Sequence, residues 1–166
     1  MAAGETLVVF TPLGYEPPST NYATLDTRNS HPVLDFDAAA ATRAAVWTGV
    51  LPSNYSGNGI TIYLHWAAST ATSGNVVWQS SFEYISDGSL DIDSDGFASA
   101  VTWSAAATSG TSGIVTVSSQ AHTNGAEIDS IVAGASFRLK IERLGSNGSD
   151  TMAGDAEIVA VELQET

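Results

Sequence analysis

The chain has 166 residues and carries 18 acidic against 5 basic side chains, a formal net charge of −13. Such a surface repels phosphate backbones and anionic membranes, so we expect neither nucleic acid nor membrane among its partners. The absence of cysteine excludes disulfides and thiolate chemistry. This length suffices for one domain with a full hydrophobic core.

The polar part of the composition favours strands over helices. Only 14% of residues are charged, and the remaining polarity comes from Ser, Thr, Asn and Gly, which suit strand faces and turns. Lys140 is the only lysine, although long helices normally rely on Lys, Glu, Gln and Arg for their exposed faces. We therefore expect an all-β protein.

The first 32 residues differ from the rest. The segment 6–10 (TLVVF) is a short strand candidate, and the segment 11–32 holds four of the five prolines. Proline fixes φ and removes a hydrogen-bond donor, so 11–32 is predicted to be neither a central strand nor a helix. We interpret residues 1–32 as an extended arm on its own surface or a neighbour's, with Tyr15 and Tyr22 as candidate partner contacts.

From residue 33 onward, apolar residues recur at every second position between turn signals, which is typical of half-buried antiparallel strands. The predicted body, residues 33–166, is an antiparallel two-sheet sandwich of jelly-roll type. One short helix is expected near 126–133, with Gly134 as its stop. About eight strands are predicted, near 33–37, 43–51, 59–68, 75–86, 96–105, 113–121, 135–144 and 155–164.

The residue types that carry chemistry form no catalytic pattern in the sequence. The three histidines lack metal-binding spacing, and no G-x-S-x-G motif is present. The four tryptophans sit in alternating apolar rows, so we assign them to the core rather than to a sugar-stacking platform. Four strand glutamates are interpreted as solvent-facing rather than as paired glycosidase carboxylates: Glu83, Glu142, Glu157 and Glu162. We expect no enzymatic activity.

One motif suggests a cation. Asp91, Asp93 and Asp95 precede Gly96 at the spacing that opens a calcium loop, because alternate carboxylates of a looped chain reach one centre. The twelfth position is Thr102, where such a loop needs a bidentate Glu. We therefore favour an acidic turn, keep these three residues as the only calcium candidate and expect no other cofactor.

Positive charge is concentrated near the C-terminus. Arg138, Lys140 and Arg143 supply three of the five basic residues and share one predicted strand. They are interpreted either as cross-strand partners of acidic residues or as a contact with another subunit.

Four segments resemble structural proteins encoded by tailed bacteriophages: VLDFD (33–37), GVLPSNYSGNGITIYLHWAAS (49–69), SGNVVWQSSFEYI (73–85) and DTMAGDAEIVAVELQET (150–166). They are similar to head-decoration, or cement, proteins with a jelly-roll body. The resemblance implies a virion protein made in the host cytoplasm that sits on the outer capsid surface. It would stabilise the capsid by binding the major capsid protein and its own symmetry mates, as a homotrimer.

Two other functions stay open at this stage. One is a carbohydrate-binding or host-receptor-binding sandwich of a phage tail or fibre, which requires exposed aromatic residues in a groove. The other is a hydrolase that uses strand carboxylates.

Overall fold

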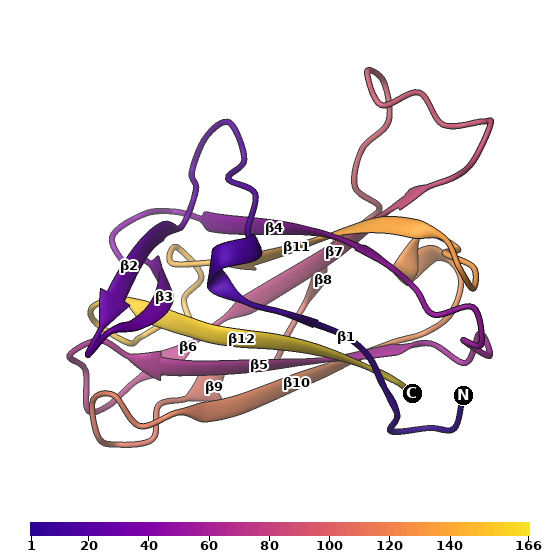
Figure 1. Cartoon of the computed structure of the whole chain (residues 1–166). Helices are drawn as coiled ribbons and strands as arrows, with labels where there is room; N and C mark the ends of the chain where they lie inside the picture. The colour runs from indigo at the N-terminus through magenta and orange to yellow at the C-terminus, as the bar shows by residue number, and fades with distance from the viewer.

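The computed structural model describes all 166 residues, and it consists of two facing antiparallel sheets (Figure 1). The larger sheet has the order β10-β5-β12-β3-β2, and β1 also pairs with β12. Its strands are β1 (Thr6–Phe10), β2 (Thr24–Arg28), β3 (His31–Phe36), β5 (Ile60–Ala68), β10 (Thr116–His122) and β12 (Ala156–Glu165). The predicted fold class, an all-β antiparallel sandwich, is confirmed.

The smaller sheet has the order β4-β11-β7-β8. Its strands are β4 (Arg43–Val50), β7 (Trp78–Ile85), β8 (Val101–Thr102) and β11 (Ser136–Arg143), and a separate two-stranded ladder joins β6 (Asn75–Val76) to β9 (Ala106–Ala107). The chain changes sheet at each step from β3 to β4, from β4 to β5 and from β5 to β7. It changes sheet again from β10 to β11 and from β11 to β12. This repeated crossing is the wrapping of a jelly roll.

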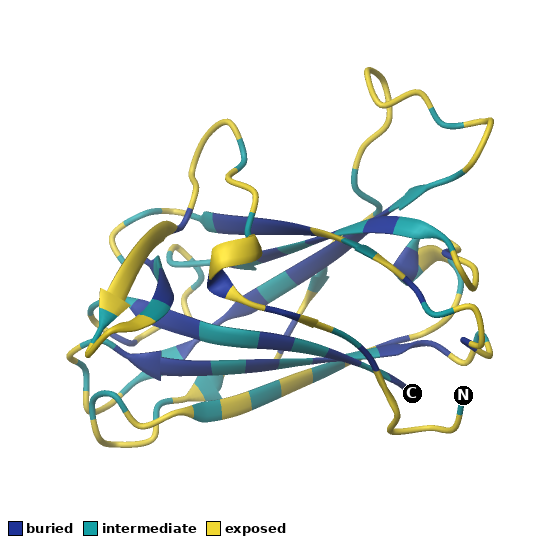
Figure 2. Cartoon of the chain, viewed as in Figure 1, coloured by how far each residue is buried: buried dark blue, intermediate teal, exposed yellow.

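The core lies between the two sheets, where alternate residues of each strand point inward (Figure 2). Ile62, Leu64 and Trp66 of β5 face Leu139 and Ile141 of β11, and all five are fully buried. The four tryptophans are at most 4% exposed. The prediction that they belong to the core is confirmed.

The predicted helix near 126–133 is wrong. The structure has one 3₁₀ turn there, η2 (Ala126–Ile128), and a second one, η1 (Pro12–Gly14), near the N-terminus. Asp129 and Ser130 follow η2 with φ angles of 55° and 58°, and this left-handed backbone cannot continue a helix. Neither turn has the length or apolar character to span a bilayer.

The N-terminal segment differs from the expected arm, because it is built into the sandwich. β1 pairs with β12, and β3 crosses the expected boundary between residues 32 and 33. Between β1 and β2 the chain runs along the free edge of β4. There the Glu16 N–H donates to the Val46 carbonyl at 2.7 Å, and the Ala23 N–H to the Ala44 carbonyl at 2.8 Å. Leu7, Phe10 and Ala23 enter the core, and their burial explains why the segment folds back.

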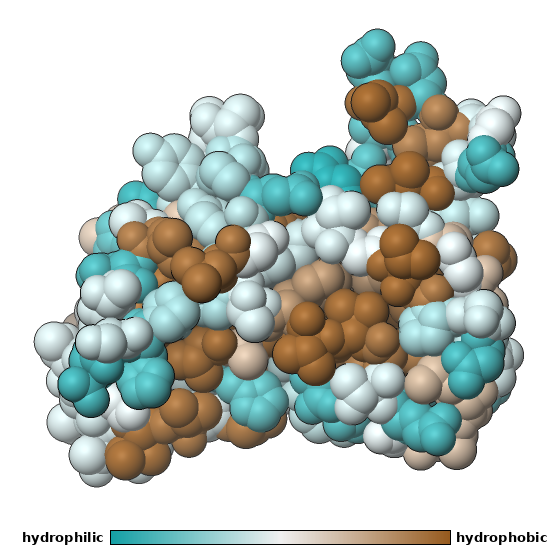
Figure 3. Space-filling model, in the orientation of Figure 1, coloured by the Kyte–Doolittle hydropathy of each residue, from teal (hydrophilic) through white to brown (hydrophobic).

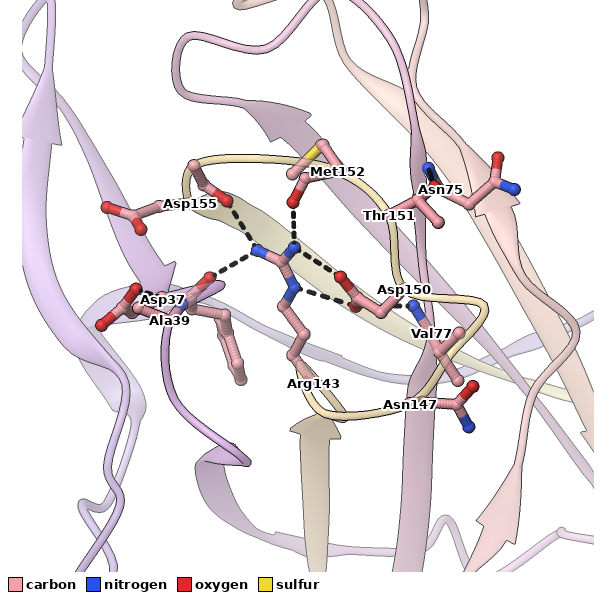
Figure 4. Close-up of polar contacts among 12 residues, drawn as sticks. Asp37, Ala39, Asn75, Val77, Arg143, Asn147, Asp150, Thr151, Met152 and Asp155 are labelled. Atoms are coloured by element: carbon pink, nitrogen blue, oxygen red, sulfur yellow. Dashed lines mark hydrogen bonds and ion pairs between the residues drawn. The ribbon is translucent and has the colours of Figure 1, made fainter.

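A buried arginine joins the two sheets at one end of the sandwich (Figure 4). The Arg143 guanidinium donates to both carboxylate oxygens of Asp150, at 2.7 and 3.0 Å. It also donates to the carbonyls of Phe36, Met152 and Gly154, at 2.7–3.0 Å. All five N–H donors of the guanidinium therefore have partners. Asp150 in turn accepts the Val77 N–H at 3.0 Å.

We expect Arg143→Met to lower the free energy of unfolding by about 3–5 kcal/mol, because it leaves the Asp150 carboxylate buried without its counter-charge. Urea unfolding followed by the fluorescence of the buried tryptophans measures the loss. Arg43→Met is the matched control, since Arg43 pairs with Asp37 at 3.5 Å near the surface and such pairs contribute about 1 kcal/mol or less. Equal losses in the two variants would contradict this role of Arg143.

Candidate functional site

The calcium candidate lies on the exposed loop between β7 and β8, which projects from the body (Figure 1). The Asp93 N–H donates to Asp91 Oδ1 at 3.0 Å, and the N–H groups of Ser94 and Asp95 donate to the Asp91 carbonyl at 3.0 Å. Asp91 thus serves as a turn residue. Nowhere in the 166 residues do three acidic or histidine side chains gather in an arrangement that could hold a metal ion.

The structure brings Arg138 and Lys140 together on the outer side of β11. Arg138 pairs with Glu83 at 2.8 Å, Lys140 pairs with Glu142 at 3.4 Å, and both cations lie about 5 Å from the centre of the Phe97 ring. The Arg138–Glu83 pair matches the cross-strand interpretation, whereas Lys140 and Glu142 lie two residues apart on β11 itself. Both cations have partners within the chain, and their role as partner contacts stays a prediction.

The interpretation of Arg143 as a partner contact is wrong, whereas that of Tyr15 stays a prediction. Arg143 is fully buried because strand alternation places it on the inward face of β11, with Phe137, Leu139 and Ile141. Tyr15 is partly buried, and its hydroxyl donates to the Ala23 carbonyl at 2.7 Å. Tyr22 remains exposed beside β4 and stays a candidate contact.

Every positive charge of the chain contacts a carboxylate. The five basic side chains and the N-terminal amine all form ion pairs within 4 Å. The remaining surface charge is therefore wholly acidic, which favours partners with basic or neutral surfaces.

The exposed face of the larger sheet is the most distinctive surface of the molecule. Strand register places Val9, Glu162, Tyr63 and Ser119 in one row across β1, β12, β5 and β10. The next row contains Ala160, His65 and Val117. Figure 3 shows hydrophobic patches on the side of the molecule that carries these strands.

A groove of about 580 Å³ opens at the end of this face where β2 and β3 turn. Its walls combine apolar and polar side chains, and its volume lies within the usual range of small-ligand sites. The lining residues are Thr11, Pro12, Arg28, Asn29, His31, Pro32, Val33, Ala67, Gly113, Val115, Glu157 and Val159.

An ion pair between Arg28 and Glu157 forms the charged part of the groove. Arg28 also donates to the Ala68 carbonyl at 3.1 Å and to Ser112 Oγ at 2.9 Å. These bonds tie β2 to β5, to β12 and to the loop before β10. No local motif in the sequence indicates this site, because Arg28 and Glu157 are 129 positions apart.

Asp35 lies opposite Glu157 in the ladder between β3 and β12. Its pKa is raised from 3.8 to about 6, first by burial and then by the carboxylates of Glu157, Asp155 and Asp26. Its Oδ1 is buried without a hydrogen-bond partner. An ionised Asp35 therefore destabilises this part of the sheet.

A serine and a histidine do meet, but they meet inside the core. Ser80 Oγ lies 2.9 Å from His122 Nε2 and accepts a hydrogen bond from Trp103 Nε1 at 2.8 Å. Ser80 and His122 are fully buried, and burial lowers the pKa of His122 to about 4. A substrate has no access to this pair, so we interpret it as a core hydrogen bond between the sheets.

No family model matches the sequence, and no curated protein matches it. Among solved structures, the chain is similar to the CBM22-2 xylan-binding domain of Xyn10C from Paenibacillus barcinonensis. That match has a TM-score of 0.45 and 12% sequence identity, and it covers 92% of each chain.

Asp35→Asn is expected to stabilise the protein at pH 7 by about 1–2 kcal/mol, a value reduced for solvent screening of this half-exposed group. The folded state binds the Asp35 proton more tightly than the unfolded chain, so wild-type stability falls as pH rises from about 4 to about 6. The advantage of the variant should therefore vanish below pH 4. Urea unfolding at pH 4, 5, 6 and 7 measures it, and a pH-independent difference would contradict the role of Asp35.

Proposed function

We propose that this chain is a non-enzymatic module that binds a protein surface through the exposed face of its larger sheet. The resemblance to phage decoration proteins implies that this surface is the coat-protein shell of a tailed phage, which the chain would decorate and stabilise. The observation that carries the proposal is the apolar character of this face.

Three valines lie exposed on or beside this face: Val9 is 57% exposed, Val117 52% and Val115 47%. The outer face of an antiparallel sheet normally carries polar residues when it meets water. Exposed apolar residues on such a face favour a contact surface. Burial of these side chains against coat subunits would supply binding free energy at about 25 cal/mol per Å².

The charges on this face fit a protein contact. Glu157 is neutralised by Arg28, whereas Glu162 accepts a hydrogen bond from the Thr6 hydroxyl and keeps its negative charge, which a basic group of the coat surface would pair. The remaining acidic surface favours a coat surface with basic or neutral character.

A second candidate is a carbohydrate ligand in the groove, favoured by the hydrogen-bonding groups of Arg28, Asn29 and His31 along its wall. The buried tryptophans count against it, because none can stack on a sugar ring. No tyrosine or phenylalanine lines the groove either.

The Val9→Ser/Val115→Ser double variant is expected to bind emptied capsid shells at least about tenfold more weakly, because it removes about 1.4 kcal/mol or more of apolar burial. Cosedimentation with shells of the phage that encodes the chain measures the affinity. Val132→Ser, at an equally exposed valine in the loop before β11, should bind like wild type.

Wild-type protein that fails to cosediment with shells would overturn the capsid proposal. Glycan-array binding that disappears in Asn29→Ala would establish the carbohydrate reading in its place.

A further inference from the structure

The larger sheet ends at β10, and no strand of the chain lies beyond it (Figure 1). The other sheet edges are short or covered. β2 has five residues and β8 has two, and the segment from Glu16 to Ala23 hydrogen-bonds along β4. The seven residues of β10 are therefore the longest open edge of the molecule.

This edge lacks the features by which proteins prevent strand pairing. Charged residues, proline and bulges normally protect an exposed edge. The stretch 96–126 contains no Asp, Glu, Lys or Arg and no proline, and β10 pairs with β5 without a bulge. β10 is thus an unprotected and uncharged edge on a protein of net charge −13.

The backbone groups of β10 divide between its two sides. Residues of an antiparallel strand turn alternately toward and away from their neighbour. A Cβ built on Gly59, at the start of β5, would lie 2.5 Å from the His122 carbonyl, so His122 turns toward β5. The Ala121 carbonyl instead accepts the Gln120 side-chain amide. Val117, Ser119 and Ala121 therefore present their N–H and C=O groups to the open edge.

We propose that this edge pairs with β10 of a second copy of the chain, antiparallel and about a two-fold axis at Ser119. Ser119 is the middle residue of β10, so this register uses the whole strand. Ser119 lies opposite Ser119 of the second copy, and Val117 opposite its Ala121. Each of these is a hydrogen-bonded pair, because odd-numbered residues face outward on both copies.

Charge explains why a second copy fits this edge. Two chains of net charge −13 repel each other wherever their carboxylates approach, and the stretch 96–126 contributes no carboxylate to that repulsion. A two-fold contact is self-complementary and needs only one edge. It gives a dimer, in place of the homotrimer that the resemblance implies, and it does not depend on the binding face proposed above.

Cysteine cross-linking tests the register, because the native chain contains no cysteine. Hydrogen-bonded residues across an antiparallel ladder have Cα atoms about 5.5 Å apart, within the range that a disulfide spans. We expect Ser119→Cys to form a covalent dimer rapidly under mild oxidation. Val9→Cys, in the same row of the same face but on β1, should cross-link at least about tenfold more slowly. Equal rates would overturn the register.

Sedimentation equilibrium tests the dimer itself. Wild type is expected at twice the 17.1 kDa chain mass, and Ser119→Pro at the chain mass, since proline removes an N–H that faces the open edge. Wild type diluted until it is monomeric serves as the reference for folding. A thermal unfolding midpoint of Ser119→Pro equal to that reference would show that the variant is folded. Ser119→Lys, which opposes two like charges at the axis, should also be monomeric, and Val9→Lys should stay dimeric. A monomeric wild type, or a dimeric Ser119→Pro, would overturn the proposal.

Discussion

The sandwich depends on one buried ion pair. Arg143 ends β11 of the smaller sheet, and its guanidinium reaches the Phe36 carbonyl at the end of β3 in the larger sheet. Asp150 neutralises it and also accepts the Val77 N–H beside β7. A buried ion is tolerated only when its polar atoms are satisfied, and here the loop 150–154 supplies the missing acceptors. The crossing from β11 to β12 is therefore held where the two sheets meet.

The pairing of the few positive charges with carboxylates also determines the charge of the surface. Arg28 is used to neutralise Glu157 in the groove, and Arg138 to neutralise the buried Glu83. With every cation engaged, the long-range field of the protein is acidic, and on the face over β1, β12, β5 and β10 Glu162 lacks a cation partner. Acidic loops such as 86–96 face water and keep the protein soluble, whereas the sheet face and its β10 edge offer apolar and backbone groups for contact.

Local patterns predicted the features that depend on local geometry. The period of two located most strands and assigned the tryptophans to the core, because alternation across a strand needs no knowledge of its neighbours. Of the strand predicted near 96–105, only β8 (Val101–Thr102) forms. The same alternation places Arg143 among the inward residues of β11. This pattern already argues against Arg143 as a partner contact. Glu83 and Glu157 were predicted to face solvent, yet they are buried because their arginine partners come from distant strands. The groove and the folded-back N-terminus likewise depend on pairings between distant segments, which one sequence does not reveal.

The open edge and the exposed face belong to one sheet, and this has a consequence for binding. A two-fold axis through a hydrogen-bonded antiparallel pair stands perpendicular to the sheet. Pairing of β10 would therefore place the exposed faces of both copies on the same side of one continuous sheet. Two grooves and two sets of exposed valines would then meet a partner surface together. On a lattice of repeated coat subunits, the second contact would form at high effective concentration, so that a modest apolar face on each copy becomes a firm attachment.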